Sequence, residues 1–306
     1  MKIENENYTI WTISDENGKV SSKVYQVFQG IQLIFTEAHM QSYTFGDNEK
    51  WSDDVFEITY CKEGRIECGI NDEFCYLEAG DLAIAHSNGI SRESYFPLCH
   101  FHGVSIRIDA RLVSNSLSHI LEDLEVAPDE LMKKFCRNKN GFIVRSFSSV
   151  ERIFEELYSG SHKFQKGYMK IKVLELLLFL SVFEIEEKKI DTRTYSNTQV
   201  VLAKKVAEYL MKHMDKRITL EQLAKQFHIS GSHLKNIFKA VYGVSYYSYV
   251  RAQKMQSAAY MLEYTDKSIL QIAGEHGYDN GSKFANAFRS VIGMNPNEYR
   301  NKNKSI

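Results

Sequence analysis

The chain has 306 residues, of which 43% are hydrophobic and 25% are charged, and this composition is typical of a globular protein of about two domains. Residues 1–5 are polar and lack the apolar core of a signal peptide. The most apolar stretch, near 171–185, is too short and too interrupted by charge to cross a bilayer. We therefore expect a cytoplasmic protein without a membrane span, whose five cysteines stay reduced.

Residues from about 8 to 110 contain many short runs of β-branched and aromatic residues, separated by turn residues. Strands at a spacing near ten residues are typical of a sandwich or a small barrel. The expected strands span 24–28, 32–35, 55–60, 65–70, 74–77, 82–85 and 102–108.

Residues 111–187 change to a helical period. The strongest predicted helix spans about 167–186 and carries apolar residues at steps of three and four. Leu178 and Phe179 widen its apolar arc beyond what one neighbour covers, which favours a helix buried on two sides, as at a dimer interface. The alternative is that this helix packs only against the barrel of its own chain and forms no dimer interface.

A short polar segment, residues 188–197, separates two parts of opposite charge. Residues 198–306 contain 16 Lys and Arg and 8 Asp and Glu, a balance of +8, and residues 1–197 carry −9. This asymmetry favours a basic part that meets a polyanion, and a solvated surface of uneven charge is the alternative. We predict one domain over 1–187, a linker over 188–197 and a second domain over 198–306.

The basic part contains the same helical unit twice. Thr219 with Gln222, and Ser268 with Gln271, form the capping-box pattern at an offset of 49 residues. Each unit predicts a short helix, a tight turn, a second helix and a glycine stop, which is the helix-turn-helix plan. A predicted helix over about 245–264, roughly 30 Å long, joins the units. A turn of B-DNA is roughly 34 Å, so two recognition helices joined by this helix would meet successive faces of the major groove.

Residues 218–250 and 267–300 resemble the two halves of an AraC/XylS-type DNA-binding domain, and the resemblance covers about 198–302. The second half keeps the family spacings I-A-x-x-x-G-Y/F, F-x-x-x-F and G-x-x-P-x-x-Y-R. These spacings are carried by Ile272, Ala273, Gly277, Tyr278, Phe284, Phe288, Gly293, Pro296, Tyr299 and Arg300. Residues 251–255 depart from the usual R-I-x-x-A, and Gly274 weakens its helix.

Residues 76–84 resemble, less specifically, a strand–turn–strand of the cupin-like sensor domain found in many AraC/XylS members. The resemblance implies a two-domain α+β protein. Its N-terminal cupin-like β-barrel, with flanking dimerisation helices, would sense an effector, and its C-terminal all-α domain would contain both helix-turn-helix units. The implied partners are double-stranded DNA, a small-molecule effector, a second copy of the chain and RNA polymerase.

The predicted recognition helices span about 231–242 and 281–292. Their inward stripes are expected to be Leu234, Ile237, Phe238 and Val241, and Phe284, Ala287, Phe288 and Val291. By the resemblance, the residues that face the bases are Ser232, Lys235, Asn236, Ser282, Lys283 and Asn286. Asn pairs with adenine and Lys with guanine, which agrees with this assignment. Lys239 and Arg289 come one turn later and are expected to meet phosphates. A solvated surface position is the alternative for each.

The histidines and cysteines of the N-terminal part match no known metal or catalytic pattern. His100 and His102 lack the glutamate that follows the H-x-H of metal-binding cupins. Cys61, Cys68 and Cys75 recur at steps of seven and are expected to be buried free thiols. We therefore expect no metal, no cofactor and no catalytic residue. Residues that would suit a small-molecule pocket, but equally the core or the surface, are Trp51, Glu57, Tyr60 and His102.

The sequence thus predicts a DNA-binding transcription regulator rather than an enzyme, and activation is the commoner mode in the family it resembles. Two alternatives stay open. One is a constitutive DNA-binding protein whose barrel serves only for dimerisation. The other is a metal-dependent cupin enzyme fused to a DNA-binding domain.

Overall fold

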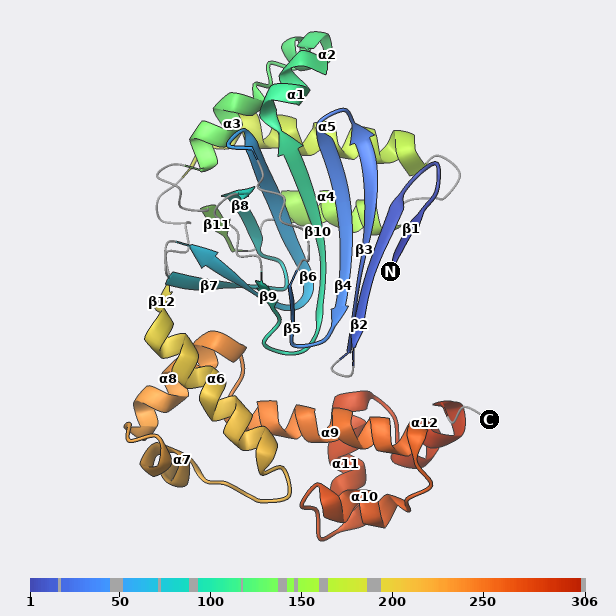
Figure 1. Cartoon of the computed structure of the whole chain (residues 1–306), viewed down its shortest axis with the longest axis vertical. Helices are drawn as coiled ribbons and strands as arrows, with labels where there is room; N and C mark the ends of the chain where they lie inside the picture. The colour runs from blue at the N-terminus through green and yellow to red at the C-terminus, as the bar shows by residue number, and fades with distance from the viewer. Residues whose placement is uncertain are drawn as a thin grey trace. The chain divides into compact units, whose positions relative to one another are not determined.

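The computed structural model (Figure 1) describes residues 1–15, 18–44, 52–70, 73–87, 93–116, 118–136, 142–145, 148–159, 165–185 and 194–303. Trp51 and most of the expected linker lie outside these residues. The chain divides into two compact units, Met1–Ser196 and Asn197–Ile306. Within the described ranges, no helix combines the length and the apolar character needed to cross a membrane.

The N-terminal unit is built on one large antiparallel sheet. Its strands are β1 (Lys2–Glu4), β2 (Thr9–Asp15), β3 (Gly18–Phe28), β4 (Ile31–His39), β6 (Val55–Ile70), β7 (Glu73–Glu78), β8 (Leu82–His86), β10 (Phe101–Asp109), β11 (Phe142–Val144) and β12 (Tyr195–Ser196). The strand order is β1-β2-β3-β4-β10-β6-β7-β12, with β8 between β6 and β11. A separate small sheet pairs β5 (Ser42–Thr44) with β9 (Glu93–Tyr95).

The sheet does not close on itself in the part of the chain that the structure describes, because β1 and the strands at the other end of the order do not pair with each other. The expected strands are present, except that those over 55–60 and 65–70 form one continuous strand, β6, so the turn expected between them was wrong. The expected closed cupin-like barrel is not confirmed. The reason is that closure depends on which distant strands meet, and alternation along each strand carries no information about that. The last residues of the expected linker, Tyr195 and Ser196, form β12 and pair with β7.

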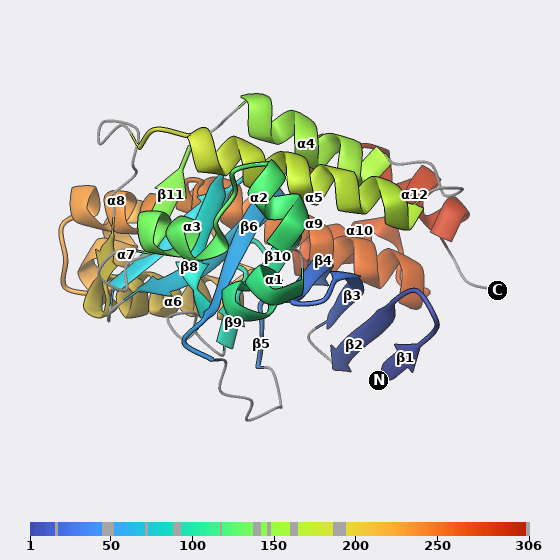
Figure 2. The ribbon, with the colours of Figure 1, turned by 90° about the horizontal axis from the view of Figure 1, so that it is seen from above.

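Helices cover one face of this sheet. α4 (Ser148–Ser159) and α5 (Gln165–Val182) lie side by side (Figure 2) and contribute to the main core together with inward residues of β3, β4, β6 and β10. The ring of Phe154 stacks on Tyr60 at a centroid distance of 4.5 Å. Three short helices, α1 (Ala110–Ser116), α2 (Ser118–Asp123) and α3 (Pro128–Phe135), follow β10. The predicted helix over 167–186 is therefore confirmed as α5, although α5 ends at Val182.

The C-terminal unit is entirely helical. Its helices are α6 (Asn197–Lys212), α7 (Leu220–Gln226), α8 (Gly231–Tyr242), α9 (Tyr246–Tyr264), α10 (Ile269–Glu275), α11 (Gly281–Ile292) and α12 (Pro296–Asn303). α9 packs against α8 on one side of the repeat and against α10, α11 and α12 on the other. It is 19 residues long, which corresponds to about 28 Å, so it separates the two helical pairs by nearly the length expected.

Candidate nucleic-acid interface

The first helix-turn-helix consists of α7, a tight turn and α8. Thr219 caps α7: its side chain accepts from the Gln222 amide at 3.2 Å, and the Gln222 side chain accepts from the Thr219 amide at 2.8 Å. Ser230 caps α8 in the same way, through the amide of His233. α8 then ends at Gly243, whose φ of 72° is the left-handed conformation that a glycine C-cap adopts freely. Local capping therefore sets the boundaries of this unit.

The second helix-turn-helix repeats this construction in α10 and α11. Ser268 and Gln271 form the reciprocal capping box at 3.2 and 2.8 Å. Asn280 caps α11 by accepting from the amides of Ser282 and Lys283. The expected recognition helices over 231–242 and 281–292 are both confirmed, as α8 and α11.

Apolar residues hold each recognition helix by one face. Leu234, Ile237, Phe238 and Val241 are buried on α8, and Phe284, Ala287 and Phe288 are buried on α11. The prediction for Val291 was wrong, because its side chain is 36% exposed. α8 packs against α6 as well as α7 and α9, whereas the packing partners of α11 are α9, α10 and α12. Each recognition helix therefore packs against the long helix that precedes its unit, α8 against α6 and α11 against α9.

The opposite face of each recognition helix is polar and open to solvent. All the residues predicted to meet DNA are exposed, namely Ser232, Lys235, Asn236, Lys239, Ser282, Lys283, Asn286 and Arg289. Among the described residues, no carboxylate pairs with any of the four cations in this set. Over the ranges that the structure describes, the one side-chain hydrogen bond of these eight residues is between the hydroxyls of Ser232 and Ser230, at 3.2 Å. Donors on both helices are therefore available to a ligand.

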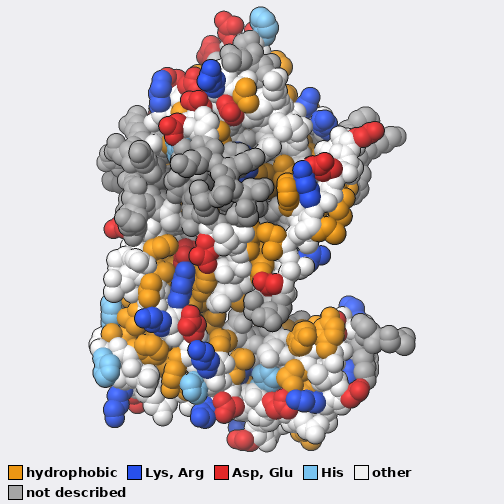
Figure 3. All heavy atoms as spheres, viewed as in Figure 1, with side chains coloured by type: hydrophobic (Ala, Val, Ile, Leu, Met, Phe, Trp, Pro, Cys, Tyr) orange, Lys and Arg blue, Asp and Glu red, His pale blue; other side chains and the backbone are white. Residues whose placement is uncertain are grey.

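Basic side chains are not confined to the recognition helices. Figure 3 shows Lys and Arg distributed over the visible surface of α6, α7 and α8, and Asp and Glu gathered near α1 and α2 of the N-terminal unit. This distribution follows the opposite net charges of the two parts of the sequence. An extended basic surface suits the evenly spaced phosphates of a nucleic acid.

Three basic residues have structural roles that the sequence analysis missed. Arg251 on α9 donates to the hydroxyl of Ser290 on α11. Arg300 on α12 donates to the carbonyl of Leu262 at 3.3 Å and to that of Lys267 at 2.5 Å. Lys254 is buried in α9, and its burial lowers the pKa of its ammonium group. Arg251 and Arg300 bond to segments that are distant in sequence, so spacing alone did not reveal their partners.

The pocket candidates of the N-terminal unit do not form one site. The carboxylate of Glu57 accepts from Arg107 at 2.9 and 3.1 Å, whereas Tyr60 points to the other face of β6 and lies in the main core. Burial raises the pKa of Tyr60 to about 12. His102 instead lies close to two other histidines. All five cysteines are free, and burial raises the pKa of Cys61 to about 12.

Comparison with known proteins places the C-terminal unit in a class. Residues 223–302 match the family described as "Helix-turn-helix domain". The HTH-type transcriptional regulator YdiP of Escherichia coli K12 is 35% identical over 105 residues, which cover 34% of this chain and 35% of that protein. YfiF of Bacillus subtilis 168, also named an HTH-type transcriptional regulator, is 35% identical over 104 residues, covering 34% of this chain and 33% of YfiF.

A similar solved structure is the C-terminal domain of AraT, a response regulator from Geobacillus stearothermophilus. It is 29% identical, covers 34% of this chain and 88% of that chain, and has a TM-score of 0.34. The chain spans about a third of the length of the curated relatives it matches. The C-terminal unit is a helix-turn-helix domain. This domain is of the AraC type, which confirms the resemblance seen in residues 198–302.

Proposed function

We propose that this chain is a sequence-specific DNA-binding transcription regulator. The observation that carries the proposal is the paired arrangement of α8 and α11. Each is held by a buried stripe and presents unpaired amide and ammonium groups, and both pack on the rigid helix α9. Lys235 and Asn236 of α8, and Lys283 and Asn286 of α11, read base edges in successive major-groove segments. Lys239 and Arg289 bind phosphates.

The test is binding of the full-length protein to DNA from upstream of its own coding sequence. We expect Lys235→Ala and Lys283→Ala each to weaken binding to the preferred site by about 1–3 kcal/mol and to relax sequence preference. The matched control is Lys302→Ala, which removes an exposed lysine of the same unit outside both helix-turn-helix units. Binding that keeps its sequence preference in both recognition-helix variants contradicts the assignment.

We also propose that the N-terminal unit mediates homodimerisation through α5. Ile171, Leu178 and Val182 are 63, 39 and 72% exposed on this helix, although the rest of its apolar residues belong to the core. Exposed apolar side chains on a helix with a buried opposite face favour a second, intermolecular contact. Leu178→Glu should shift the protein to a monomer in sedimentation experiments. Ile120→Glu on α2, where another apolar side chain is 44% exposed, is the control and should leave the dimer intact.

Effector sensing by the N-terminal unit, with activation through contact with RNA polymerase, follows from the family resemblance. A small molecule that shifts the DNA-binding equilibrium must also stabilise the state it prefers. Screening for a ligand that changes both operator affinity and thermal stability tests this. If no ligand changes either quantity, the protein is a constitutive DNA-binding protein whose N-terminal unit serves only for dimerisation. Transcription from the bound promoter then distinguishes activation from repression.

A further inference from the structure

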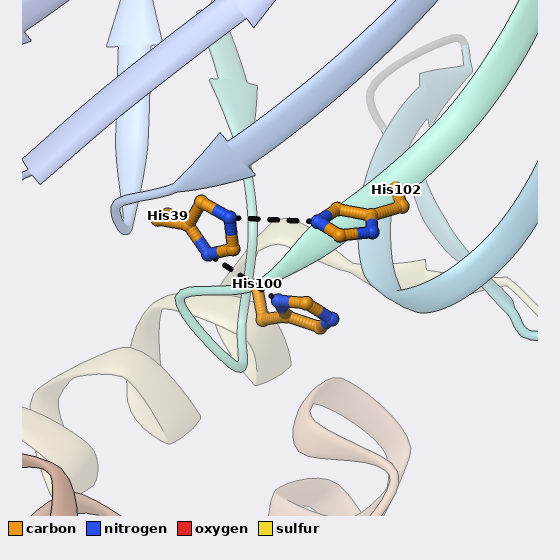
Figure 4. Close-up of side chains that lie close together, drawn as sticks. All are labelled: His39, His100 and His102. Carbon is orange, nitrogen blue, oxygen red and sulfur yellow. Dashed lines mark hydrogen bonds between the residues drawn. The ribbon is translucent and has the colours of Figure 1, made fainter. Parts of the chain in front are cut away.

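Three imidazole rings meet at one end of the large sheet of the N-terminal unit. His39 is the last residue of β4, His100 precedes β10, and His102 lies within β10 (Figure 4). One ring nitrogen from each can be chosen so that all three lie within 4.8 Å of one another. In the part of the chain that the structure describes, this is the one group of three or more potential metal-ligating side chains that come this close.

The strand register brings these residues together. β10 pairs with both β4 and β6, and Phe101 is opposite Ala38 of β4 and Gly64 of β6. The end of β4 therefore lies beside the start of β10, although 61 residues separate His39 from His100 in the chain.

Close backbone packing fixes the same region. A Cβ atom at Gly18 would lie 2.0 Å from the carbonyl oxygen of His39, and one at Gly64 would lie 2.0 Å from that of His100. Both glycines have positive φ, 140° and 81°, so the chain uses their freedom to approach the two histidines closely. The backbones that carry the rings are thus packed tightly before any ligand binds, which reduces the ordering cost of binding.

The ring nitrogens are already close to metal-binding separations. His39 Nδ1 lies 3.5 Å from His100 Nδ1, and His39 Nε2 lies 3.4 Å from His102 Nε2. Ligands at about 2.0–2.1 Å from a tetrahedral Zn²⁺ are roughly 3.4 Å apart. Each histidine can supply only one nitrogen to one ion, so the widest separation, 4.8 Å, must contract by roughly 1.4 Å, which ring rotation at this partly exposed site can supply.

Glu63 of β6 is placed to support the imidazoles rather than to replace one of them. Its Oε2 lies 3.5 Å from His100 Nε2 and 3.6 Å from His102 Nδ1, which are the nitrogens that do not face His39. Metal-ligating histidines commonly donate their second N–H to a carboxylate, which fixes the ring orientation. Glu63 is in position to accept both, after a small movement.

Charged side chains of both signs surround the rings. Burial and the neighbouring histidines lower the pKa of His39 and His102. Glu37 faces His39 and His102, and Glu63 faces His102, whereas Lys62 is the opposing positive charge. Lys19 is opposite His39 in the register of β3 and β4 and adds a second ammonium group.

We propose that His39, His100 and His102 form a binding site for a divalent transition-metal ion of the zinc type, with Glu63 as the outer carboxylate. Imidazole ligands favour Zn²⁺, Ni²⁺ or Cu²⁺ over Mg²⁺ or Ca²⁺, which prefer oxygen ligands. Three protein ligands leave one position of a tetrahedral ion for water or a small ligand. This site is independent of the DNA-binding role proposed above, because all four residues belong to the N-terminal unit.

The experiment is a Co²⁺ titration of the full-length chain, made without a polyhistidine tag and freed of metal with a chelator that is then removed. We expect one Co²⁺ per chain, visible absorption typical of a low-coordinate ion, and loss of that absorption when Zn²⁺ is added. His39→Gln and His102→Gln should abolish the absorption. Glu63→Gln should weaken binding by about 10–100-fold while retaining the absorption. His119→Gln, at an exposed histidine of α2, is the matched control and should bind as the unmodified chain does.

A second readout does not depend on any variant being folded. Binding of paramagnetic Co²⁺ to the unmodified chain should shift or broaden the imidazole NMR signals of three histidines out of ten. The proposal is overturned if millimolar Co²⁺ gives no stoichiometric absorption. It is also overturned if folded His39→Gln and His102→Gln chains retain binding, or if the affected NMR signals come from other histidines. In those cases the three rings form only a hydrogen-bonded cluster.

Discussion

The two helix-turn-helix units have the same plan and differ in how far the recognition helix is buried. In both, a capping box starts the first helix and a left-handed glycine ends the second. The left-handed turn residue is His228 in the first unit, with φ of 54°, and Gly277 in the second, with φ of 73°. α6 packs against the first recognition helix and α9 against the second, but Val241 of the first is buried whereas the equivalent Val291 of the second is partly exposed. The two units therefore share their caps and their buried apolar faces, and they differ in how far the last turn of the recognition helix is buried.

The largest effect should come from the core of each unit. Phe238 and Phe288 occupy equivalent buried positions, so Phe238→Ala and Phe288→Ala should each lower the free energy of unfolding by about 3–5 kcal/mol. Urea denaturation of the full chain, followed by helical circular dichroism, measures the loss. Phe→Leu at the same positions is the control and should cost much less. Equal costs for Leu and Ala would show that the rings are not packed as described.

The turn residues should respond differently to substitution. Gly277→Ala places a Cβ 2.7 Å from the carbonyl oxygen of Asp215 at a positive φ, and it should destabilise the protein by about 1–3 kcal/mol. His228→Gly relieves left-handed strain but adds backbone entropy to the unfolded chain, so its net effect should stay within about 1 kcal/mol. Thermal melts of both variants measure the contrast. If His228→Gly destabilised the protein more than Gly277→Ala does, the predicted difference between the two turn residues would be contradicted.

The capping boxes should contribute equally. Thr219→Ala and Ser268→Ala each remove a side-chain acceptor for an N-terminal amide and should each cost about 1 kcal/mol. Thr219→Ser and Ser268→Thr keep the acceptor and serve as controls. If one alanine variant is neutral, its helix is held by packing rather than by its cap.

The smallest effect should be at the predicted phosphate contacts. Lys239→Ala and Arg289→Ala should each reduce the slope of log affinity against log salt by about 0.9, with no change in sequence preference. Fluorescence anisotropy with a labelled duplex at several salt concentrations measures the slope. A change in sequence preference instead would move that residue to a base contact.

The sequence predicted the C-terminal unit far better than the N-terminal one, and the reason is the range of the interactions. The boundaries of α8 and α11 depend on Ser230, Asn280, Gly243 and Gly293, which act within one turn of the helix. In contrast, sheet closure, the partners of Arg251 and the exposure of Val291 depend on contacts between distant segments.

The same limit explains the histidines. His100 and His102 are two residues apart at the start of β10, and the absence of a cupin-type glutamate was an argument against a metal site. Glu63 and His39 come from two other strands, and only the pairing of β10 with β4 and β6 brings them near. No spacing in the sequence indicates that neighbourhood.

The most direct test of the central claim is a base-resolution footprint of the full-length protein on its preferred DNA. The account predicts, for each chain, two contacted major-groove segments about one helical turn apart. Lys235→Ala with Asn236→Ala should remove protection and base preference in one segment, and Lys283→Ala with Asn286→Ala in the other. A single contacted segment, or the same segment lost in both double variants, would contradict the claim that the two recognition helices read DNA separately.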